Sequence, residues 1–307
     1  MKVGFSLPQL GPQASAENLI KVATRAEQLG YDSLWVLERL LWPINPREPY
    51  PPAPDGSLPQ EYQIVLDPIE TLTFVAAHTR RIGLGTSVIV LPYHSPIVLA
   101  RRIATLDVLS GGRVHLGVGV GWSTDEFEAA GIPFERRGAR SDEILEAMIK
   151  LWTTDPVGFN GTFYRIPESK VGPKPLQKPY PPIYVAGFGQ YTFDRAVKYG
   201  QGWNPAGVPS FEWLGQMIKQ LRETASRAGR GEMEVVLRSF TIAFDQPNSR
   251  ARAPLMGTLD ELRDDIKRLR DVGVTHLIHS PPAMGFTQLP SIEPALRLME
   301  QLISISR

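Results

Sequence analysis

Three short glycine clusters are the residues whose spacing comes closest to a known binding chemistry. They span Gly83–Gly85, Gly117–Gly121 and Gly187–Gly189, and each resembles a piece of the glycine fingerprint that holds a dinucleotide, although none completes it. The third cluster follows an apolar run and opens a helical pattern, where backbone N–H groups can hold a phosphate. We therefore predict an anion site there, with a plain tight turn as the alternative. Its residues are Gly187, Phe188 and Gly189.

Carboxylates and tryptophans gather after other apolar runs. Glu38 ends the run SLWVL, and Asp125 and Glu126 follow a second run. Two carboxylates at strand ends are what a barrel glycosidase needs, and spacing alone leaves that reaction open. Trp42 and Trp122 suit a sugar or a flat heterocycle, and they equally suit packing between loops.

The histidines do not predict a metal site. His276 and His279 are three residues apart in an expected strand, so they point to opposite faces. His78 ends an expected helix, His115 lies inside a strand, and His94 alone lies in a loop at a strand end. No G-x-S-x-G sequence occurs, which disfavours a serine hydrolase.

The stretch from Arg81 to Trp122 predicts elements that position several of these residues. Residues 82–91 and 114–120 are nearly continuous apolar runs, typical of strands buried on both faces, and residues 95–111 read as a helix between them. Buried strands joined by a crossover helix indicate a parallel sheet, whose ligands lie at the carboxyl ends of the strands. The residues at these ends are Ser87, Val88, Tyr93, His94 and Gly119 to Trp122.

The same alternation runs through the whole chain. We expect strands at Lys2–Leu7, Ser33–Leu37, Ile82–Leu91, Val114–Val120, Ile183–Ala186, Gln201–Asn204, Glu234–Phe244 and His276–His279. We expect helices at 16–29, 67–78, 95–111, 141–152, 192–198, 212–228, 259–272 and 293–303. Eight strand-then-helix units predict a (β/α)8 TIM barrel in one domain, residues 1–307, with an open doubly wound sheet as the alternative.

Proline is enriched in two segments. The chain has 28 prolines among 307 residues, where about 5% is usual. Residues 43–59 and 167–182 hold many of them and can be neither helix nor central strand. We interpret them as ordered insertions, about 42–66 after the second strand and 153–182 after the fourth helix; a flexible linker is the alternative.

Composition excludes several classes of protein. The net charge of +1 gives no reason to expect nucleic acid or an anionic membrane as a partner. The chain has no cysteine, which excludes disulfides and thiolate metal sites and fits a cytoplasmic location. We find no signal-peptide pattern and no apolar run of membrane-spanning length.

Four stretches resemble the bacterial luciferase-like monooxygenase superfamily and, within it, the coenzyme F420-dependent oxidoreductases. They are residues 26–43, 82–122, 181–203 and 257–278, and IGLGTSVIVLPYHSPIVLARRIATLDVLSGGRVHLGVGVGW (82–122) is the most specific of them. The resemblance implies a (β/α)8 barrel with an enlarged loop after the fourth helix. It also implies a deazaflavin (F420) or a flavin (FMN) lying across the mouth of the barrel, and a homodimer, since many relatives dimerise.

The resemblance also implies roles for individual residues. F420-using members have a non-prolyl cis peptide in strand three, which bulges behind the cofactor ring and matches Ser87-Val88 here. The family's phosphate-binding turn matches Gly187, Phe188 and Gly189, and the wall after strand four matches Gly119, Gly121 and Trp122. We expect Trp42, Tyr93 and His94 to border the substrate pocket.

One position departs from the family pattern. Members that oxidise alcohols or sugar phosphates carry an acid followed by histidine at the end of strand two, where this chain has Glu38-Arg39. A guanidinium stays protonated and cannot act as a base, but it can hold an anion or a developing oxyanion. We expect Arg39 and Glu38 to be the catalytic residues, with Glu38 orienting Arg39 or donating a proton; a structural Glu–Arg pair is the alternative.

These patterns predict an F420-dependent oxidoreductase that transfers a hydride between the deazaflavin and a small carbonyl, enone or alcohol. An FMN-dependent monooxygenase is the first alternative, because flavin carries a reactive N5 where a deazaflavin has carbon. A barrel glycosidase is a further alternative. So is a non-catalytic barrel that binds a flavin-like ligand or a protein.

Overall fold

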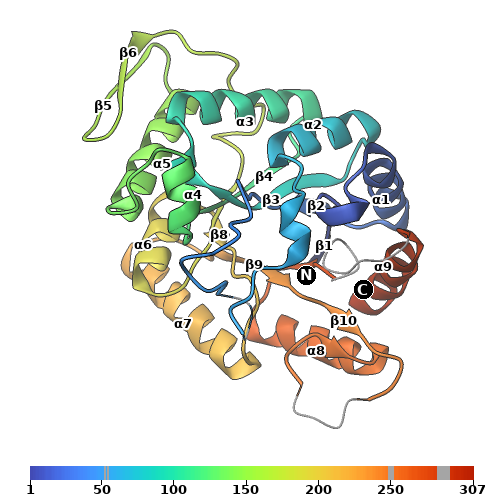
Figure 1. The fold of residues 1–307 in the computed structure, drawn as a ribbon. Coiled ribbons are helices and arrows are strands. Elements are labelled where there is room, and N and C mark those ends of the chain that lie inside the picture. The colour runs from blue at the N-terminus through green and yellow to red at the C-terminus, as the bar shows by residue number, and fades with distance from the viewer. Residues whose placement is uncertain (52, 54, 248–251, 282–290) are drawn as a thin grey trace.

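Eight parallel strands form a closed barrel in the computed structural model, which describes residues 1–51, 53, 55–247, 252–281 and 291–307 (Figure 1). Around the barrel the strands follow the order β1-β12-β9-β8-β7-β4-β3-β2, and all pairs are parallel. The predicted (β/α)8 fold is confirmed. The barrel strands are β1 (Lys2–Ser6), β2 (Ser33–Val36), β3 (Gly83–Val90), β4 (Val114–Gly119), β7 (Ile183–Val185), β8 (Gly202–Trp203), β9 (Glu234–Ser239) and β12 (His276–His279).

Helices surround this barrel in an outer ring (Figure 1). Side-chain caps mark the N-termini of several helices. Ser15 caps α1 by accepting from the Asn18 N–H, and Thr258 and Glu261 form a capping box on α8. The helices are α1 (Ala16–Leu29), α2 (Pro68–His78), α3 (Pro96–Ser110), α4 (Thr124–Ala129), α5 (Arg137–Thr153), α6 (Gln190–Tyr199), α7 (Phe211–Arg227), α8 (Leu259–Val272) and α9 (Glu293–Ser306). The short helix α4 was not expected from the sequence.

An aromatic cluster fills the barrel interior on its amino-terminal side. The Trp35 ring lies 6.0 Å from His115, 6.4 Å from Tyr184 and 5.4 Å from His276, measured between ring centroids. A Cβ at Gly85 would lie 2.4 Å from the Trp35 ring, so glycine in β3 is what leaves room for this side chain. These buried side chains fill part of the barrel interior.

The seventh barrel strand is shorter than predicted. We expected Glu234–Phe244, but β9 ends at Ser239, and Ile242–Ala243 forms a separate strand, β10, paired with β11 (Met256–Gly257). The Thr241 N–H donates to the Ser239 carbonyl in a tight turn, which takes the chain out of the barrel. The apolar residues from 234 to 244 therefore belong to two strands separated by a turn at residues 239–241, and the residue types at that turn did not indicate it.

The second insertion contains regular structure that its prolines concealed. An antiparallel hairpin, β5 (Val157–Asn160) with β6 (Arg165–Ser169), projects from the barrel (Figure 1). The Glu143 carboxylate of α5 accepts the N–H groups of the hairpin turn, residues 162–164, at 2.7 to 2.8 Å. The sequence analysis excluded a helix and a central strand from residues 167–182, and this peripheral hairpin is neither, because a two-stranded ribbon tolerates a proline that a central strand does not.

The first insertion is ordered against the body of the barrel. A 3-10 helix (Gln60–Gln63) and a bridge between Leu10 and Val65 tie it down, and Leu58 and Tyr62 pack with Leu10 and Leu37. Residues 52 and 54 of this insertion lie outside the described residues. Within the described ranges, no helix is both long and apolar enough to cross a bilayer.

Candidate active site

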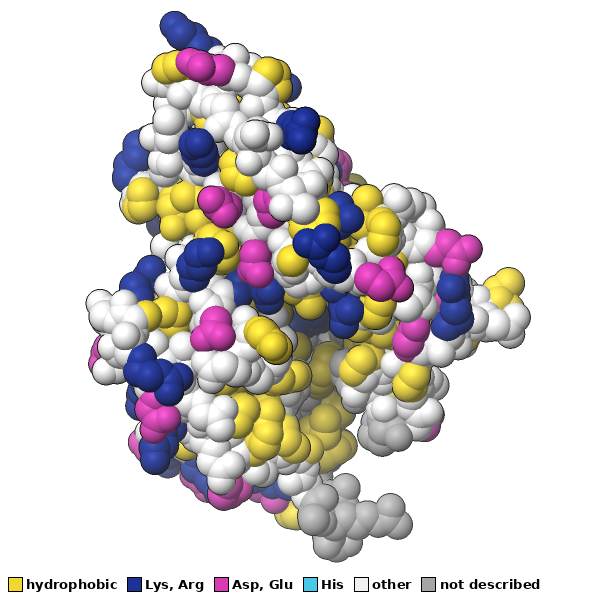
Figure 2. Space-filling model, turned by 90° about the vertical axis from the view of Figure 1, so that its left-hand side faces the viewer, with side chains coloured by type: hydrophobic (Ala, Val, Ile, Leu, Met, Phe, Trp, Pro, Cys, Tyr) yellow, Lys and Arg dark blue, Asp and Glu magenta, His cyan; other side chains and the backbone are white. Residues whose placement is uncertain are grey.

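A cavity of about 340 Å³ lies at the carboxyl ends of the barrel strands. This volume is typical of a small-molecule site. The surface in Figure 2 is hollowed, and hydrophobic side chains cover much of the visible wall. Residues that line the cavity include Glu38, Arg39, Tyr62, Ser87, Val88, Tyr93, Gly119, Gly121, Trp122, Glu126, Gly187, Phe188, Asn204 and Arg238.

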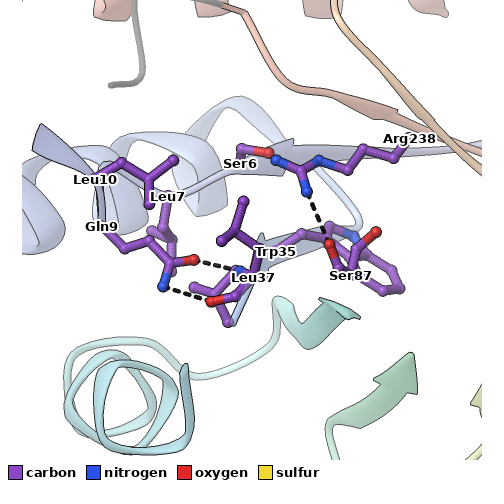
Figure 3. Close-up of a pocket in the computed structure, with 9 residues that line it drawn as sticks. Ser6, Leu7, Gln9, Leu10, Trp35, Leu37, Ser87 and Arg238 are labelled. Atoms are coloured by element: carbon purple, nitrogen blue, oxygen red, sulfur yellow. Dashed lines mark hydrogen bonds between the residues drawn. The ribbon is translucent and has the colours of Figure 1, made fainter. Parts of the chain in front are cut away.

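Gln9 positions the end of the second strand. Its side-chain amide donates to the Leu37 carbonyl at 2.9 Å and accepts the Leu37 N–H, as Figure 3 shows. Gln9 is itself 1% exposed and also donates to Leu66 at 2.8 Å. The backbone that carries Glu38 and Arg39 into the cavity is therefore held from both sides.

Glu38 pairs with His94. Its Oε1 lies 2.8 Å from His94 Nε2, and its Oε2 accepts the Val90 N–H at 2.7 Å. The Glu38 side chain is 4% exposed and that of His94 is 14% exposed. Glu38 does not pair with Arg39, which the first of its two predicted roles would require, because the 3-10 turn after β3 brings a histidine to this carboxylate instead.

Arg39 pairs with Glu126. The two groups lie 3.2 Å apart, and their side chains are 6% and 3% exposed. The guanidinium carbon also lies 4.9 Å from the Trp122 ring and 5.6 Å from the Tyr62 ring. Its Nε and Nη2 have no acceptor among the described residues.

Glu126 is the buried carboxylate of this wall. It accepts the Leu40 N–H at 2.7 Å and the Tyr93 hydroxyl at 3.2 Å. Burial raises the pKa of Glu126, and the nearby Arg39 charge opposes that rise. The sequence named Glu126 only as a glycosidase carboxylate, whereas the structure uses it to neutralise a buried cation.

Replacing Glu126 by glutamine is expected to destabilise the fold by about 3 kcal/mol, because it leaves the Arg39 charge buried and unpaired. Urea unfolding would measure this loss. Glu128→Gln is the matched control, since Glu128 is 71% exposed and pairs with a surface arginine, Arg47; there we expect less than about 1 kcal/mol. Equal losses in the two variants would contradict the buried pair.

The Ser87-Val88 peptide is cis, as the resemblance implied, and the β3–β4 register shifts between Thr86 and Ile89. Arg238 donates from Nη1 to the Ser87 carbonyl at 2.8 Å (Figure 3), and the Glu38 N–H donates to the Val88 carbonyl at 3.2 Å. The bulge is thus held from β9 on one side and from the end of β2 on the other.

Arg238 was missed by the sequence analysis. It is 8% exposed, lines the cavity, and donates from Nε to Ser280 Oγ at 3.0 Å. No carboxylate lies within ion-pair distance of it among the residues described. A lone arginine inside the apolar run EVVLRS was the signal, because a buried charge in a strand calls for a functional or structural explanation.

Glycines shape the opposite wall. A Cβ on Gly119 would lie 2.9 Å from Val88 Cγ2, so glycine in β4 leaves room for the bulge. Gly187 and Phe188 also line the cavity, and Gly189 caps α6 with φ 85°. The predicted arrangement of a turn that opens a helix is confirmed, and its first N–H groups lack intrahelical acceptors by geometry.

Trp42 and His94 lie outside the cavity lining, as does Gly189. The Trp42 indole donates to the Pro59 carbonyl at 3.1 Å and packs against the buried cluster of the first insertion. His94 is hydrogen-bonded to Glu38, which does line the cavity. Tyr93, by contrast, lines it directly.

The remaining histidines are structural. His276 points into the barrel toward Trp35, and His279 points outward, with Thr241 at 2.8 Å and Ser306 at 3.0 Å from its ring nitrogens. The expected opposite orientation is confirmed. In the described part of the chain, no three His, Asp or Glu side chains cluster closely enough to hold a metal ion.

The glycosidase alternative loses one of its carboxylates. Asp125 accepts from Arg47 at 2.7 Å and does not line the cavity. Glu126 is engaged by Arg39 and Tyr93. Neither arrangement leaves a carboxylate free to attack or activate water opposite Glu38.

Fold and site together define a parallel barrel with a mostly apolar small-molecule cavity at its carboxyl-end mouth and a cis-peptide bulge in the cavity wall. The chain belongs to the luciferase-like monooxygenase family, whose model matches residues 1–276. The predicted family is confirmed, and with it the predicted class of enzyme, an oxidoreductase.

Named relatives use two kinds of cofactor. The chain is 30% identical over 259 residues to an F420-dependent glucose-6-phosphate dehydrogenase of Amycolatopsis mediterranei, covering 82% of this chain and 72% of that protein. It is 34% identical over 164 residues to an FMNH(2)-dependent dimethylsulfone monooxygenase of Pseudomonas putida, covering 52% and 44%. Among solved structures, monooxygenase RslO1 from Streptomyces bottropensis superposes with a TM-score of 0.81 at 24% identity, over 99% of this chain and 98% of that one.

Proposed function

We propose that this protein is a coenzyme F420-dependent oxidoreductase that moves a hydride between the deazaflavin and a small carbonyl, enone or alcohol. The observation that carries the proposal is the mostly apolar cavity at the mouth of the barrel, walled by Val88, Trp122 and Phe188, in a chain of the luciferase-like family. The longer alignment with the F420-dependent relative, over 82% of the chain, supports the same choice of cofactor.

The described residues fit a flat heterocycle with a phosphate tail. The cavity has mostly apolar walls, and unpaired polar atoms, Arg39 Nε and Nη2 and Asn204 Oδ1, lie among its lining residues. Such groups match the donors and acceptors on the edge of a flavin-type ring. Residues 187–189 at the start of α6 would hold the phosphate. When bound, the deazaflavin supplies or accepts the hydride, while the protein orients it and excludes water.

The FMN-dependent monooxygenase is the second candidate, and the relative from Pseudomonas putida favours it. Titrating the protein with F420 and with FMN, and following protein and cofactor fluorescence, distinguishes the two. We expect micromolar or tighter binding of F420 and reduction of cyclohexanone or 2-cyclohexen-1-one by its reduced form. Tight FMN binding with no F420 binding would overturn the proposal.

Gly189→Ala is expected to weaken cofactor binding about tenfold, because its new methyl group would stand at the helix start where the phosphate is expected. Gly131→Ala is the matched control. Both glycines have positive φ, 85° and 68°, and neither added Cβ meets an atom within 4 Å. Gly131→Ala should lose about 1 kcal/mol of stability and Gly189→Ala about 1 to 3 kcal/mol, because Gly189 combines φ 85° with ψ 177°; only Gly189→Ala should change the cofactor Kd. If the cofactor Kd is unchanged in both variants, the proposed phosphate site at residues 187–189 is wrong.

A further inference from the structure

The Glu38–His94 pair joins the cavity to a partly exposed histidine. Glu38 lines the cavity, and its carboxylate reaches His94 at 2.8 Å across 56 residues of sequence. His94 itself does not line the cavity.

Among the described residues, Glu38 has no other ion-pair partner. The guanidinium beside it in sequence, Arg39, pairs with Glu126, and the second cavity arginine, Arg238, donates to Ser87 and Ser280. The second carboxylate oxygen of Glu38 is held by the Val90 N–H at 2.7 Å. A carboxyl group fixed at one oxygen by a backbone donor and at the other by an imidazole is oriented to exchange protons with that imidazole.

We propose that Glu38 and His94 form a proton relay, in which Glu38 exchanges a proton with the substrate oxygen and His94 exchanges it onward with solvent. The proposal rests on the proposed hydride transfer and assigns its proton route. Glu38 is the catalytic acid, and His94 is a positioning residue that acts through it.

The step balances for carbonyl reduction. Reduced deazaflavin, when bound, would supply the hydride to the carbonyl carbon and would itself be oxidised; a C–H bond would form as the C=O π bond breaks. The substrate oxygen takes the proton of the Glu38 carboxyl group. The resulting carboxylate takes the Nε2 proton of a His94 imidazolium, and solvent returns a proton to the imidazole. Alcohol oxidation runs the same steps backwards.

Three other ionisable groups surround the relay. Tyr93 lines the cavity and donates its hydroxyl to Glu126. Burial raises the pKa of Tyr93, and the charge of Glu126 adds to that rise. Arg39 and Glu126 neutralise each other at 3.2 Å. At neutral pH the Tyr93 hydroxyl stays protonated and the Arg39 guanidinium stays ionised, so neither of these two groups changes its charge there. A change in the pH dependence of turnover on altering His94 therefore reports the relay.

The first test uses the protein without cofactor. Nitrogen-15 NMR of the histidine rings should show a slowly exchanging, low-field Nε2 proton for His94 in the wild type. Glu38→Gln should abolish this signal, and His78→Gln, at the exposed end of α2, should leave it unchanged. A His94 signal that is indifferent to Glu38→Gln would overturn the pair.

The second test uses reduced F420 with 2-cyclohexen-1-one and cyclohexanone. His94→Gln keeps a hydrogen-bond donor for Glu38 but cannot carry a proton, so kcat should fall about 100-fold while KM and the F420 Kd stay within about twofold. The pH dependence of kcat should flatten, and added imidazole should restore turnover in His94→Gly. His78→Gln should behave as the wild type.

The outcomes separate the two proposals. If His94→Gln keeps kcat within about threefold, or if kcat, KM and Kd all worsen together without imidazole rescue, the relay is wrong while the F420 enzyme stands. If the wild type binds no F420, the proposed function fails, and the relay fails with it whatever the NMR result.

Discussion

We expect the free energy of unfolding to fall by about 3 kcal/mol per pH unit as the pH drops from about 6.5 towards 4. His276 and His279 are 1% and 0% exposed, and burial lowers the pKa of each to about 3. Burial also lowers the pKa of His115 to about 4. The His115 side chain is more exposed to solvent than those of His276 and His279, so we assign it a smaller part of the pH dependence of stability.

The sign follows from proton binding. In the unfolded chain these histidines take up protons near pH 6.5, whereas in the folded barrel they stay neutral down to about 4 or 3. Between those limits the unfolded state binds more protons, so stability rises with pH and is lost on acidification. Each fully buried histidine contributes about 1.4 kcal/mol per pH unit.

Urea unfolding at several pH values between about 7.5 and 5 would measure this slope, above the range in which most carboxylates titrate. His279→Gln should remove close to half of it, since its two partners, Thr241 and Ser306, are neutral hydroxyls. His78→Gln, at an exposed helix end, should leave the slope unchanged. A wild-type slope near zero would mean that the buried histidines are already charged in the folded protein.

Gly117→Ala is expected to destabilise the barrel by about 3 to 5 kcal/mol, because its added Cβ would approach another atom more closely than at any other glycine that the structure describes. A Cβ at Gly117 would lie 1.9 Å from the Thr86 carbonyl oxygen, and backbone cannot rotate away as a side chain can. The Thr86 hydroxyl already donates to the Gly117 carbonyl at 2.7 Å, which holds β3 and β4 together beside the bulge.

Soluble yield, circular dichroism and urea unfolding would measure the loss. Gly231→Ala is the control, because its Cβ meets nothing within 4 Å and its φ is not positive; we expect a change within about 0.5 kcal/mol. A Gly117→Ala protein as stable as the wild type would show that β3 and β4 can separate locally. The part of the cavity wall formed by β3 and β4 would then deform more easily than its contacts indicate.

These glycines show where a sequence pattern was right about place and incomplete about cause. The spacing of Gly117, Gly119 and Gly121 resembled part of a phosphate fingerprint. In the structure the first makes room for the Thr86 carbonyl, the second for Val88, and the third turns with φ 79° against Phe127. The 187–189 turn does open a helix, as its position after an apolar run predicted.

The chain by itself determined the barrel and the edge at which its site lies. Eight apolar runs alternating with helical patterns specify eight buried parallel strands, because hydrophobic period and caps act over a few residues. The residues that end those runs, from Ser87-Val88 to Tyr93 and Trp122, therefore meet at one mouth.

Only the tertiary structure decided which charged groups pair. Glu38 meets His94 across 56 residues, and Glu126 meets the segment after β2 across 86, while the neighbours Glu38 and Arg39 do not pair. Side-chain direction at a strand end depends on where adjacent strands and loops converge, and no local pattern encodes that distance. The histidine that contacts Glu38 therefore comes from the loop after the third strand, and no pattern near Glu38 in the sequence indicated it.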